Sequence, residues 1–240
     1  MAELVSQCAI EADDADWGTL VDTAAIPGGG NLHLFRQGQD YEILFGEEQL
    51  MGSWAYRSEE ALATLVADRL GARADRVLIG GLGMGFTLAA ARAAFPRDTS
   101  IIVAELVPRV VDWARGHLTH LFGPSLADPR VSIEVRDVHD AIAGQTRAYD
   151  AILLDVDNGP DGLINLANER LYCNWGLNAA HAALREGGML AVWSAYPDRD
   201  FAVRLRAARF DVEEVCVDGG NDDDPPHIIW LATKRAGGRR

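Results

Sequence analysis

Three acidic residues stand at or just after the ends of short apolar runs, and their side chains are of a kind that can hold a nucleoside or handle a proton. They are Glu105, Asp137 and Asp155. A carboxylate can accept hydrogen bonds from both hydroxyls of a ribose, or from an exocyclic amine such as adenine N6. Because the carboxyl ends of parallel strands meet at one edge of a sheet, we expect these side chains to share one site.

A glycine-rich turn precedes them at Gly81, Gly83 and Gly85, just after the apolar run Val77–Ile79. Glycine permits positive φ in such a turn and leaves room for a ligand against the main chain. The Ala-rich segment Phe86–Ala94 is predicted to be a helix whose free N–H groups and positive dipole end face the turn. Turns of this kind also occur in proteins that bind nothing, so the turn alone leaves both interpretations open.

The spacing between the glycine turn and Glu105 favours a ligand. Glu105 stands 20 residues after Gly85 and ends the next apolar run, Ile101–Ala104. An acidic residue at about this separation on the next parallel strand binds a ribose diol in dinucleotide-binding folds. Glu105 is therefore predicted to mark a nucleoside site. The alternative is a surface glutamate that caps a helix over Val107–Leu118.

Carboxylates cluster again in the segment 155–160, which reads Asp-Val-Asp-Asn-Gly-Pro. Two acids and an amide leave a buried strand together, and proteins tolerate clustered carboxylates where a cation or a proton is handled. Asp155 and Asp157 are therefore the predicted catalytic residues. A structural Asx-rich turn is the alternative here. For Asp137 the alternative is an N-cap of the helix that starts at His139.

From Arg76 onward, apolar runs alternate with helical patterns, which predicts the elements that position these residues. Such alternation is typical of a parallel sheet with right-handed crossovers, whose ligands bind beyond the carboxyl ends of the strands. The predicted strands are Val77–Ile79, Ile101–Ala104, Val131–Val135, Ala151–Leu154 and Met189–Ser194, followed by antiparallel-type strands over Val212–Val217 and Ile228–Thr233. The predicted fold class is therefore α/β, with a Rossmann-like doubly wound sheet.

The beginning of the chain lacks this alternation and is predicted to be a small β-hairpin and helix extension. Its predicted elements are a β-hairpin over 32–45, a loop over Leu50–Trp54, and a helix that is capped by Ser58 and runs to Leu70. We therefore divide the chain into an extension over 1–70 and a nucleotide-binding catalytic domain over 71–240.

Length and charge narrow the class of ligand. With 240 residues and 48% hydrophobic content, the chain suits one α/β domain with a small appendage. Its 36 acidic and 22 basic side chains give a formal charge of −14, which repels nucleic acid and is compatible with a cationic substrate such as an amine.

The sequence predicts a cytoplasmic protein without a metal. No apolar run approaches the roughly 20 residues that cross a bilayer, so no membrane association is expected. The three cysteines are few, odd in number and far apart, which argues against a disulfide framework or a zinc site. The consecutive acids Asp222–Asp224 are interpreted as a solvated loop.

Several stretches together carry a resemblance to a known family. They are Val77–Gly85, Val103–Pro108, Leu126–Val131, Asp137, Tyr149–Asp155 and Leu184–Leu190. Over about 31–234 the chain resembles the spermidine synthase-like family, within the larger class of S-adenosylmethionine-dependent transferases with a Rossmann-like sheet. The Asp-Pro-Arg-Val element at 128–131 and the Arg-x-Gly-Gly turn at 185–188 are fairly specific to this group.

The resemblance implies a role for each site residue. Glu105 would hold the ribose, Asp137 the adenine amine, and Asp155 would lie beside the transferred group. The glycine loop would hold the amino-acid or aminopropyl tail of the cofactor. The expected cofactor-binding set is Gly81, Gly83, Met84, Gly85, Glu105, Leu106, Asp137, Val138 and Asp155. The resemblance also implies a homodimer built through the N-terminal hairpin.

Three departures from the polyamine-forming members lead us to predict a different reaction. Gly83 stands where those members usually carry an aspartate that pairs with the amine of decarboxylated S-adenosylmethionine. The segment 155–160 replaces their typical Asp-Ser/Thr-Ser/Thr-Asp-Pro loop, so that the second acid is either displaced to Asp157 or replaced by Asn158. Ser58-Glu59-Glu60 replaces their Tyr-His-Glu element, and the aromatic hydroxyl and the imidazole are lost.

Removal of the loop carboxylate makes room for the carboxylate of intact S-adenosyl-L-methionine, which would otherwise face a like charge in a site with little water. We therefore predict methyl transfer to a small amine or amino-acid-like acceptor, with S-adenosyl-L-methionine as donor. Asp155 or Asp157 would orient the acceptor and take up its proton, while the site holds nucleophile and methyl group in line.

Two alternatives remain open. The first is aminopropyl transfer from decarboxylated S-adenosylmethionine, or another alkyl transfer or ring closure that uses the cofactor's own amino-acid chain. The second is a non-catalytic nucleoside-binding sensor. The aromatic side chains either line an amine pocket through cation–π contacts or belong to the core. They are Trp54, Tyr56, Tyr172, Trp175, Trp193 and Tyr196.

Overall fold

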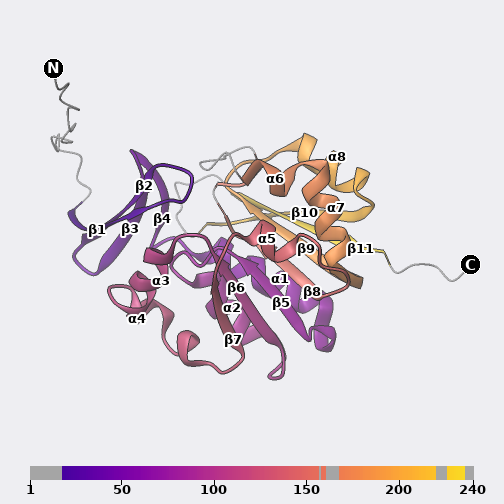
Figure 1. The fold of residues 1–240 in the computed structure, drawn as a ribbon, viewed down its shortest axis with the longest axis horizontal. Helices are drawn as coiled ribbons and strands as arrows, with labels where there is room; N and C mark the ends of the chain where they lie inside the picture. Colours follow the sequence, from indigo (N-terminus) through magenta and orange to yellow (C-terminus); the bar gives the residue numbers. More distant parts are fainter. Residues whose placement is uncertain (1–17, 157, 161–167, 220–225, 236–240) are drawn as a thin grey trace, which may run out of the picture.

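A computed structural model of the chain describes residues 18–156, 158–160, 168–219 and 226–235. Within these ranges the chain forms two β-sheets, and Figure 1 shows the smaller sheet beside the larger one. None of the helices in the described ranges has the length and apolar content to span a membrane. The sequence-based interpretations of Asp157 and of Asp222–Asp224 concern residues outside these ranges.

The smaller sheet is antiparallel and is formed by the first part of the described chain. Its strands, in spatial order, are β1 (Thr19–Ala25), β2 (Asn31–Gln37), β3 (Asp40–Phe45) and β4 (Glu48–Gly52). The predicted hairpin is confirmed as β2 and β3. The predicted loop over Leu50–Trp54 is wrong in its first half, because Met51 of β4 pairs with Ile43 of β3. An outer strand of this kind is stabilised by its hydrogen-bonded neighbour, and its short sequence carries little apolar alternation.

The larger sheet contains the predicted parallel strands. Its spatial order is β10-β11-β9-β8-β5-β6-β7. The strands are β5 (Arg76–Gly80), β6 (Ser100–Glu105), β7 (Val131–Val135), β8 (Tyr149–Leu154), β9 (Leu184–Ser194), β10 (Phe210–Val217) and β11 (His227–Lys234). Neighbours from β9 to β7 are parallel, whereas β11 is antiparallel to both β9 and β10. The prediction of a Rossmann-like α/β sheet is confirmed.

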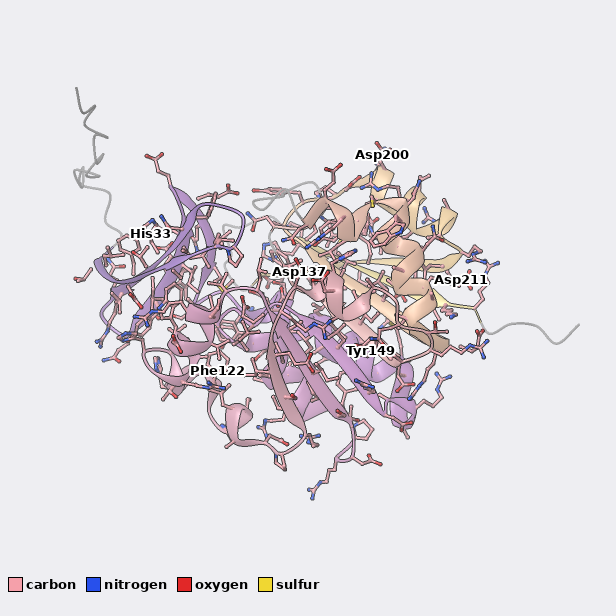
Figure 2. The ribbon with its side chains drawn as sticks, in the orientation of Figure 1. His33, Phe122, Asp137, Tyr149, Asp200 and Asp211 are labelled. Atoms are coloured by element: carbon pink, nitrogen blue, oxygen red, sulfur yellow. The ribbon has the colours of Figure 1, made fainter. Side chains whose placement is uncertain are left out.

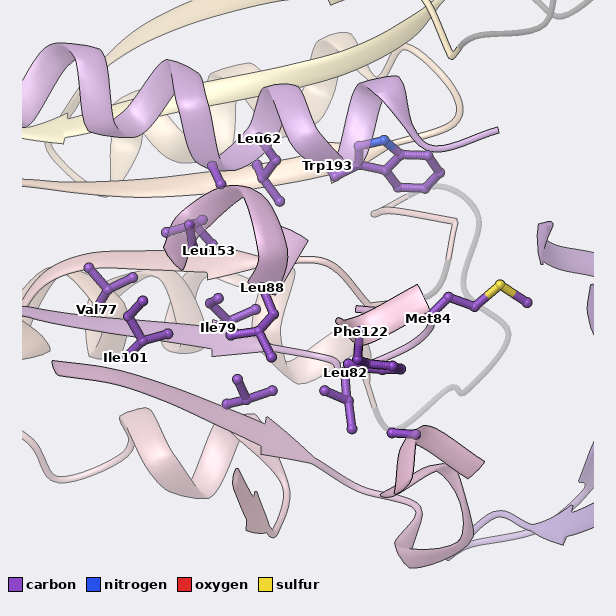
Figure 3. Close-up of a cluster of buried hydrophobic side chains, with 14 of the residues drawn as sticks. Leu62, Val77, Ile79, Leu82, Met84, Leu88, Ile101, Phe122, Leu153 and Trp193 are labelled. Atoms are coloured by element: carbon purple, nitrogen blue, oxygen red, sulfur yellow. The ribbon is translucent and has the colours of Figure 1, made fainter. Parts of the chain in front are cut away.

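Two apolar clusters pack helices against the two faces of this sheet. Because strand side chains alternate between faces, Val77 and Ile79 of β5 lie in one cluster and Leu78 lies in the other. Figure 3 shows part of the first cluster, in which Leu62 and Leu88 face the strands. The first face is covered by α1 (Arg57–Leu70), α2 (Phe86–Ala94), α3 (Pro108–Arg115) and α4 (Thr119–Phe122). The second is covered by α5 (Val138–Ile142), α6 (Glu169–Tyr172), α7 (Asn174–Ala183) and α8 (Arg199–Ala207).

The start of α1 differs from the prediction. Ser58 is not the N-cap, because the helix begins at Arg57 and Tyr56 occupies the cap position without a side-chain hydrogen bond. Ser58 is instead buried within the first turn. α1 packs on the larger sheet, whereas the strands before it form the smaller sheet. The division of the chain into two domains between residues 70 and 71 stays a prediction.

The strand order creates a crevice at the carboxyl ends of the central strands. β5 lies between β6 and β8, so the connections that leave β5 and β8 diverge to opposite sides of the sheet. Gly80 of β5 pairs with Ala104 of β6 and with Leu154 of β8. The residues that follow these three positions therefore meet at one edge, as the sequence predicted.

Candidate functional site

The backbone conformation and the close neighbours of the turn between β5 and α2 explain why it contains three glycines. Gly81, Gly83 and Gly85 have φ values of 91°, 47° and 85°, in the region that side chains other than glycine rarely adopt. A Cβ atom on Gly81 would lie 2.1 Å from the backbone oxygen of Asp155, and one on Gly85 would lie 2.3 Å from Cε1 of Phe122. The turn is therefore held tightly against the end of β8.

Glu105 is buried at the end of β6 and is bound to the glycine turn. Its Oε2 accepts a hydrogen bond from the backbone N–H of Leu82 and its Oε1 accepts one from Val107, each at 2.8 Å. Burial raises the pKa of Glu105, and the N–H groups of Val107 and Leu82 oppose this rise. The alternative of a surface glutamate is wrong, because only 7% of Glu105 is exposed. Its contact with a ribose stays a prediction, for which each carboxylate oxygen keeps a second lone pair.

Asp137 is both the N-cap of α5 and a member of the site edge. Its Oδ1 accepts from the N–H of His139 at 2.8 Å, which confirms the capping interpretation. Its Oδ2 accepts a hydrogen bond from Nη2 of Arg170 in α6. Figure 2 shows Asp137 on the side of the large sheet that faces the smaller one. The binding of an adenine amine stays a prediction, and Arg170 is a neighbour that the sequence did not reveal.

A cavity of about 130 Å³ collects most of the predicted residues. Those that line it are Gly81, Gly83, Glu105, Leu106, Asp137, Val138 and Asp155. Its other wall comes from the smaller sheet and includes Leu32, Ile43, Leu50 and Met51. The sequence did not predict that the N-terminal strands would close the site, because this contact joins segments that no local pattern connects.

A second, smaller cavity adjoins the first one. Met84 and Gly85, the remaining predicted residues, line it together with Glu59, Phe86 and Trp193. The two cavities share Leu50, Met51, Gly83 and Asp155. At their junction a Cβ atom on Gly83 would lie 3.0 Å from the sulfur of Met51. Met51 therefore covers the position from which a side chain at Gly83 would enter the site.

Two carboxylates line the second cavity, although the sequence predicted only one of them. Oδ2 of Asp155 accepts a hydrogen bond from the hydroxyl of Thr87 at 2.5 Å, and that hydroxyl lies 3.2 Å from the backbone oxygen of Glu59. Burial raises the pKa of Asp155 to about 6. Burial, and then the charge of Asp155, raises the pKa of Glu59 to about 7. Groups that titrate near neutral pH are suited to accept a proton during a reaction.

The acidic loop is described only in part, since Asp157 lies outside the described residues. Asn158 is buried, and its Nδ2 donates to Oε1 of Glu48 in β4 at 2.9 Å. A Cβ atom on Gly159 would lie 2.2 Å from Oγ of Ser194. The Asn-Gly portion of the loop therefore anchors it to β4 and β9, and the predicted catalytic role of Asp157 stays a prediction.

The aromatic residues divide between site, core and surface. Trp193 lines the second cavity. Tyr172 is buried against Phe201, at 5.7 Å between ring centroids. Tyr56 stacks on Phe86 at 4.9 Å. Among the described residues, the six predicted aromatic side chains therefore do not form one cage around an amine.

No family model matches the chain. The polyamine aminopropyltransferases of Mycobacterium tuberculosis and Mycobacterium bovis are each 31% identical to it over 169 residues, which is 68% of this chain and 30% of theirs. A spermidine synthase in complex with the transition state analogue AdoDATO superposes with a TM-score of 0.74 at 18% identity, over 90% of this chain and 73% of that one. The spermidine synthase from Thermotoga maritima gives a TM-score of 0.71 at 16% identity, over 90% and 72%.

The chain has a spermidine synthase-like fold. This spermidine synthase-like chain spans about a third of the length of the curated relatives it matches, since it covers 30% of them. The resemblance stated from its motifs is thereby confirmed at the level of the fold.

The prediction of methyl transfer from S-adenosyl-L-methionine is wrong. The curated relatives are polyamine aminopropyltransferases and the similar solved structures are spermidine synthases. The prediction depended on the missing acid at Gly83, and the structure explains why that inference failed. Glu59 lines the cavity beside the loop, so this cavity still holds two partly buried carboxylates, Glu59 and Asp155. A cofactor carboxylate in this cavity would face like charge, whereas an amine would face opposite charge.

Proposed function

We propose that this spermidine synthase-like protein transfers the aminopropyl group of decarboxylated S-adenosylmethionine to a small amine. The single observation that carries the proposal is the pair Glu59 and Asp155 in the cavity that adjoins the predicted nucleoside cavity. The polyamine aminopropyltransferases that match 68% of this chain support the same reaction.

In this proposal the adenosine part of the donor occupies the first cavity. Glu105, which the glycine turn holds at 2.8 Å from Leu82 N, accepts from the ribose hydroxyls. Leu106 and Val138 provide apolar contacts with the base, and Asp137 accepts from its amine. The sulfonium then lies near Gly83 and Asp155, which belong to both cavities.

The amine groups of donor and acceptor occupy the second cavity, where negative charge is concentrated. In a buried site, an ammonium within about 4–6 Å of a carboxylate is strongly favoured over a neutral or anionic group. Glu59 thus supplies from α1 the charge that the glycine turn lacks at Gly83. Trp193, in the same cavity, offers a ring face to a cation.

The reaction is a direct displacement. The lone pair of a neutral acceptor nitrogen forms a C–N bond to the propyl carbon attached to sulfur. The C–S bond breaks, and its electrons neutralise the sulfonium to give methylthioadenosine. The new ammonium loses one proton to the carboxylate pair of Asp155 and Glu59, whose raised pKa values match this task near neutral pH. Alignment of nitrogen, carbon and sulfur in the closed site lowers the barrier further.

Product analysis tests the proposal. The purified chain is incubated with decarboxylated S-adenosylmethionine and, in turn, diaminopropane, diaminobutane and diaminopentane, and methylthioadenosine is measured by liquid chromatography. We expect its formation to depend on a diamine, and intact S-adenosylmethionine to give no S-adenosylhomocysteine. Tight binding of the donor without turnover would favour the sensor alternative. Absence of both turnover and binding would refute the proposal.

A variant of the proposed base makes the test specific to the site. We expect Asp155→Asn to lower kcat by about 100-fold or more, because a neutral amide cannot accept the proton of the amine. Asp68→Asn, which changes an exposed carboxylate on α1, is the matched control and is expected to keep full activity. Equal activity of the two variants would remove Asp155 from the mechanism.

A homodimer and a cytoplasmic location complete the proposal. β1 and β4 are the outer strands of the smaller sheet in the described chain, and outer strands can pair with a second copy. Sedimentation equilibrium is expected to give twice the 26.0 kDa mass of the chain. A single-chain mass at micromolar concentration would contradict the dimer.

A further inference from the structure

Ser58 connects the second cavity to a histidine that comes from the other end of the chain. Ser58 is fully buried in the first turn of α1. Its hydroxyl donates to Oε2 of Glu59 at 2.6 Å, and its Oγ lies 2.8 Å from Nδ1 of His227 at the start of β11. The imidazole that the motif at 58–60 lacks in sequence is thus supplied in space by a residue 169 positions later.

These contacts form a continuous series of groups that can donate and accept hydrogen bonds. While Glu59 is ionised, Nδ1–H of His227 donates to Ser58, and Ser58 donates to Glu59. Once Glu59 is protonated and the neutral ring of His227 carries its hydrogen on Nε2, the same two contacts run in the opposite direction, from Glu59 to Ser58 and from Ser58 to Nδ1. A serine hydroxyl serves both arrangements, because it has one hydrogen and two lone pairs.

The hydrogen-bonded series Glu59–Ser58–His227 runs from the cavity wall toward solvent. Glu59 lines the second cavity with Asp155, whereas His227 is only partly buried. The ring of His227 packs edge-on against Trp193, at 4.9 Å between centroids, and Trp193 lines the same cavity. An amine that fills this cavity would separate both carboxylates from bulk water, so a proton they accept needs another route outward.

We propose that Ser58 and His227 are positioning residues that hold Glu59 and carry its proton from the site to solvent. This inference rests on the proposed function. After the C–N bond forms, the proton of the new ammonium goes to the carboxylate pair and resides on Glu59. Glu59 gives it to Oγ of Ser58 while Ser58 gives its own hydrogen to the lone pair on Nδ1 of His227, whose neutral ring carries its hydrogen on Nε2. The imidazolium then releases one proton to water, and no group changes its oxidation state.

The surrounding charges are compatible with this direction of transfer. Asp155 and Glu60 are the acidic neighbours that raise the pKa of Glu59, so a proton is attracted to it when both are ionised. The charged residues that flank the relay, Arg57 and Asp218, pair with each other at 3.3 Å on the exposed side.

The first experiment needs no turnover. The ring nitrogens of the histidines are followed by NMR as a function of pH in the full chain and in two variants, Ser58→Ala and Glu59→Gln. We expect the midpoint of His227 to fall by about 0.5–1 pH unit in each variant, because each removes a favourable partner of the imidazolium. His33, whose Nδ1 lies 3.2 Å from the hydroxyl of Thr23 on the smaller sheet, is the internal control and is expected not to move (Figure 2). An unchanged His227 midpoint in both variants would overturn the inference.

The second experiment measures methylthioadenosine formation. His227→Gln keeps a group that donates to Ser58 but cannot carry a proton, so we expect kcat to fall on the order of 10-fold while the KM for the diamine changes less than about 2-fold. Imidazole added to His227→Ala is expected to restore turnover, and His33→Gln is expected to behave as wild type. A wild-type kcat and pH profile in His227→Gln would overturn the relay.

The two experiments separate the relay from the proposed function. If the wild type forms no methylthioadenosine but the His227 midpoint shifts as expected, the proposed function fails and the hydrogen-bonded chain stands. If the wild type forms the product but neither the midpoint nor kcat responds, the relay alone fails.

Discussion

At the scale of single residues, Gly83 and Glu59 show that a charge absent from one position of a motif can be supplied to the same cavity by another element. Gly83 lacks the acid that the resemblance leads one to expect, and Met51 covers the position where that acid would enter. Glu59 lines the adjoining cavity instead. In the proposed reaction, the charge that faces the amine is therefore the sum over the cavity rather than the charge at one position in a motif.

The raised pKa of Glu59 predicts how stability changes with pH. Its folded-state pKa of about 7 lies above the ordinary value of 4.5, so its contribution is fully present below about pH 4.5 and is lost as pH rises through 7. Glu59→Gln removes this loss and still offers Ser58 an acceptor. We expect this variant to exceed the wild type by on the order of 1–2 kcal/mol in free energy of unfolding at pH 8, and to match it at pH 4.

Urea denaturation at the two pH values measures this difference. Glu47→Gln, which changes an exposed carboxylate in the turn before β4, is the control and is expected to follow the wild type at both. If the free energy of unfolding has the same pH dependence in Glu59→Gln and wild type, the surroundings of Glu59 do not raise its pKa.

At the scale of elements, the close approach of the glycine turn to β8 is what sets the position of Asp155. Gly81 and Gly144 both have positive φ, 91° and 75°, so alanine is strained at either position. They differ in space, because a Cβ on Gly81 would lie 2.1 Å from the backbone of Asp155, whereas nothing lies within 4 Å at Gly144. The pair therefore separates backbone strain from steric overlap.

We expect Gly81→Ala to lower the free energy of unfolding by about 3 kcal/mol or more, and Gly144→Ala by only about 1 kcal/mol. The overlap at Gly81 is with backbone, which cannot rotate away, so β5 and β8 must separate locally. Chemical denaturation of both variants measures the difference. Equal losses would show that φ alone explains the glycine at position 81.

At the scale of the whole molecule, one aspartate connects the two sheets that enclose the site. Oδ2 of Asp22 in β1 accepts from Nε of Arg109 and from Nε1 of Trp113, both in α3, each at 2.7 Å. These two donors hold the pKa of Asp22 down at about 2, so its contribution to stability is present above the ordinary value of 3.8 and is lost as pH falls through 2. Trp113 is 1% exposed, so its N–H has little access to water as a replacement.

We expect Asp22→Ala to destabilise the protein by about 1–3 kcal/mol, because it leaves the buried Trp113 donor without its acceptor. Hydrogen exchange is expected to become faster in β1–β4 than in β5–β8. Since Met51 of β4 lines both cavities, the KM for the amine is expected to rise as well. Asp112→Ala, which removes an exposed partner of Arg109, is the control. Uniform loss of protection across both sheets would contradict a local anchor.

Much of the large sheet could be predicted because the apolar residues of its strands and helices follow a local pattern in the sequence. Val131–Val135 and Phe86–Ala94 have the predicted bounds, since a strand with alternating apolar residues and an Ala-rich helix each carry a local period. β1 and β4 were missed, because their sequences carry little apolar alternation and they are held by cross-strand hydrogen bonds to β2 and β3.

The sequence by itself determined the alternation of strands and helices from β5 onward, the glycine turn, and the edge at which Glu105, Asp137 and Asp155 collect. These follow from side-chain periodicity and from the geometry of parallel strands, which act over short stretches of chain. Only the tertiary structure decided that Glu59 joins Asp155 and that His227 reaches Ser58. Such partners come from elements far apart in the chain, and packing rather than spacing brings their charges together.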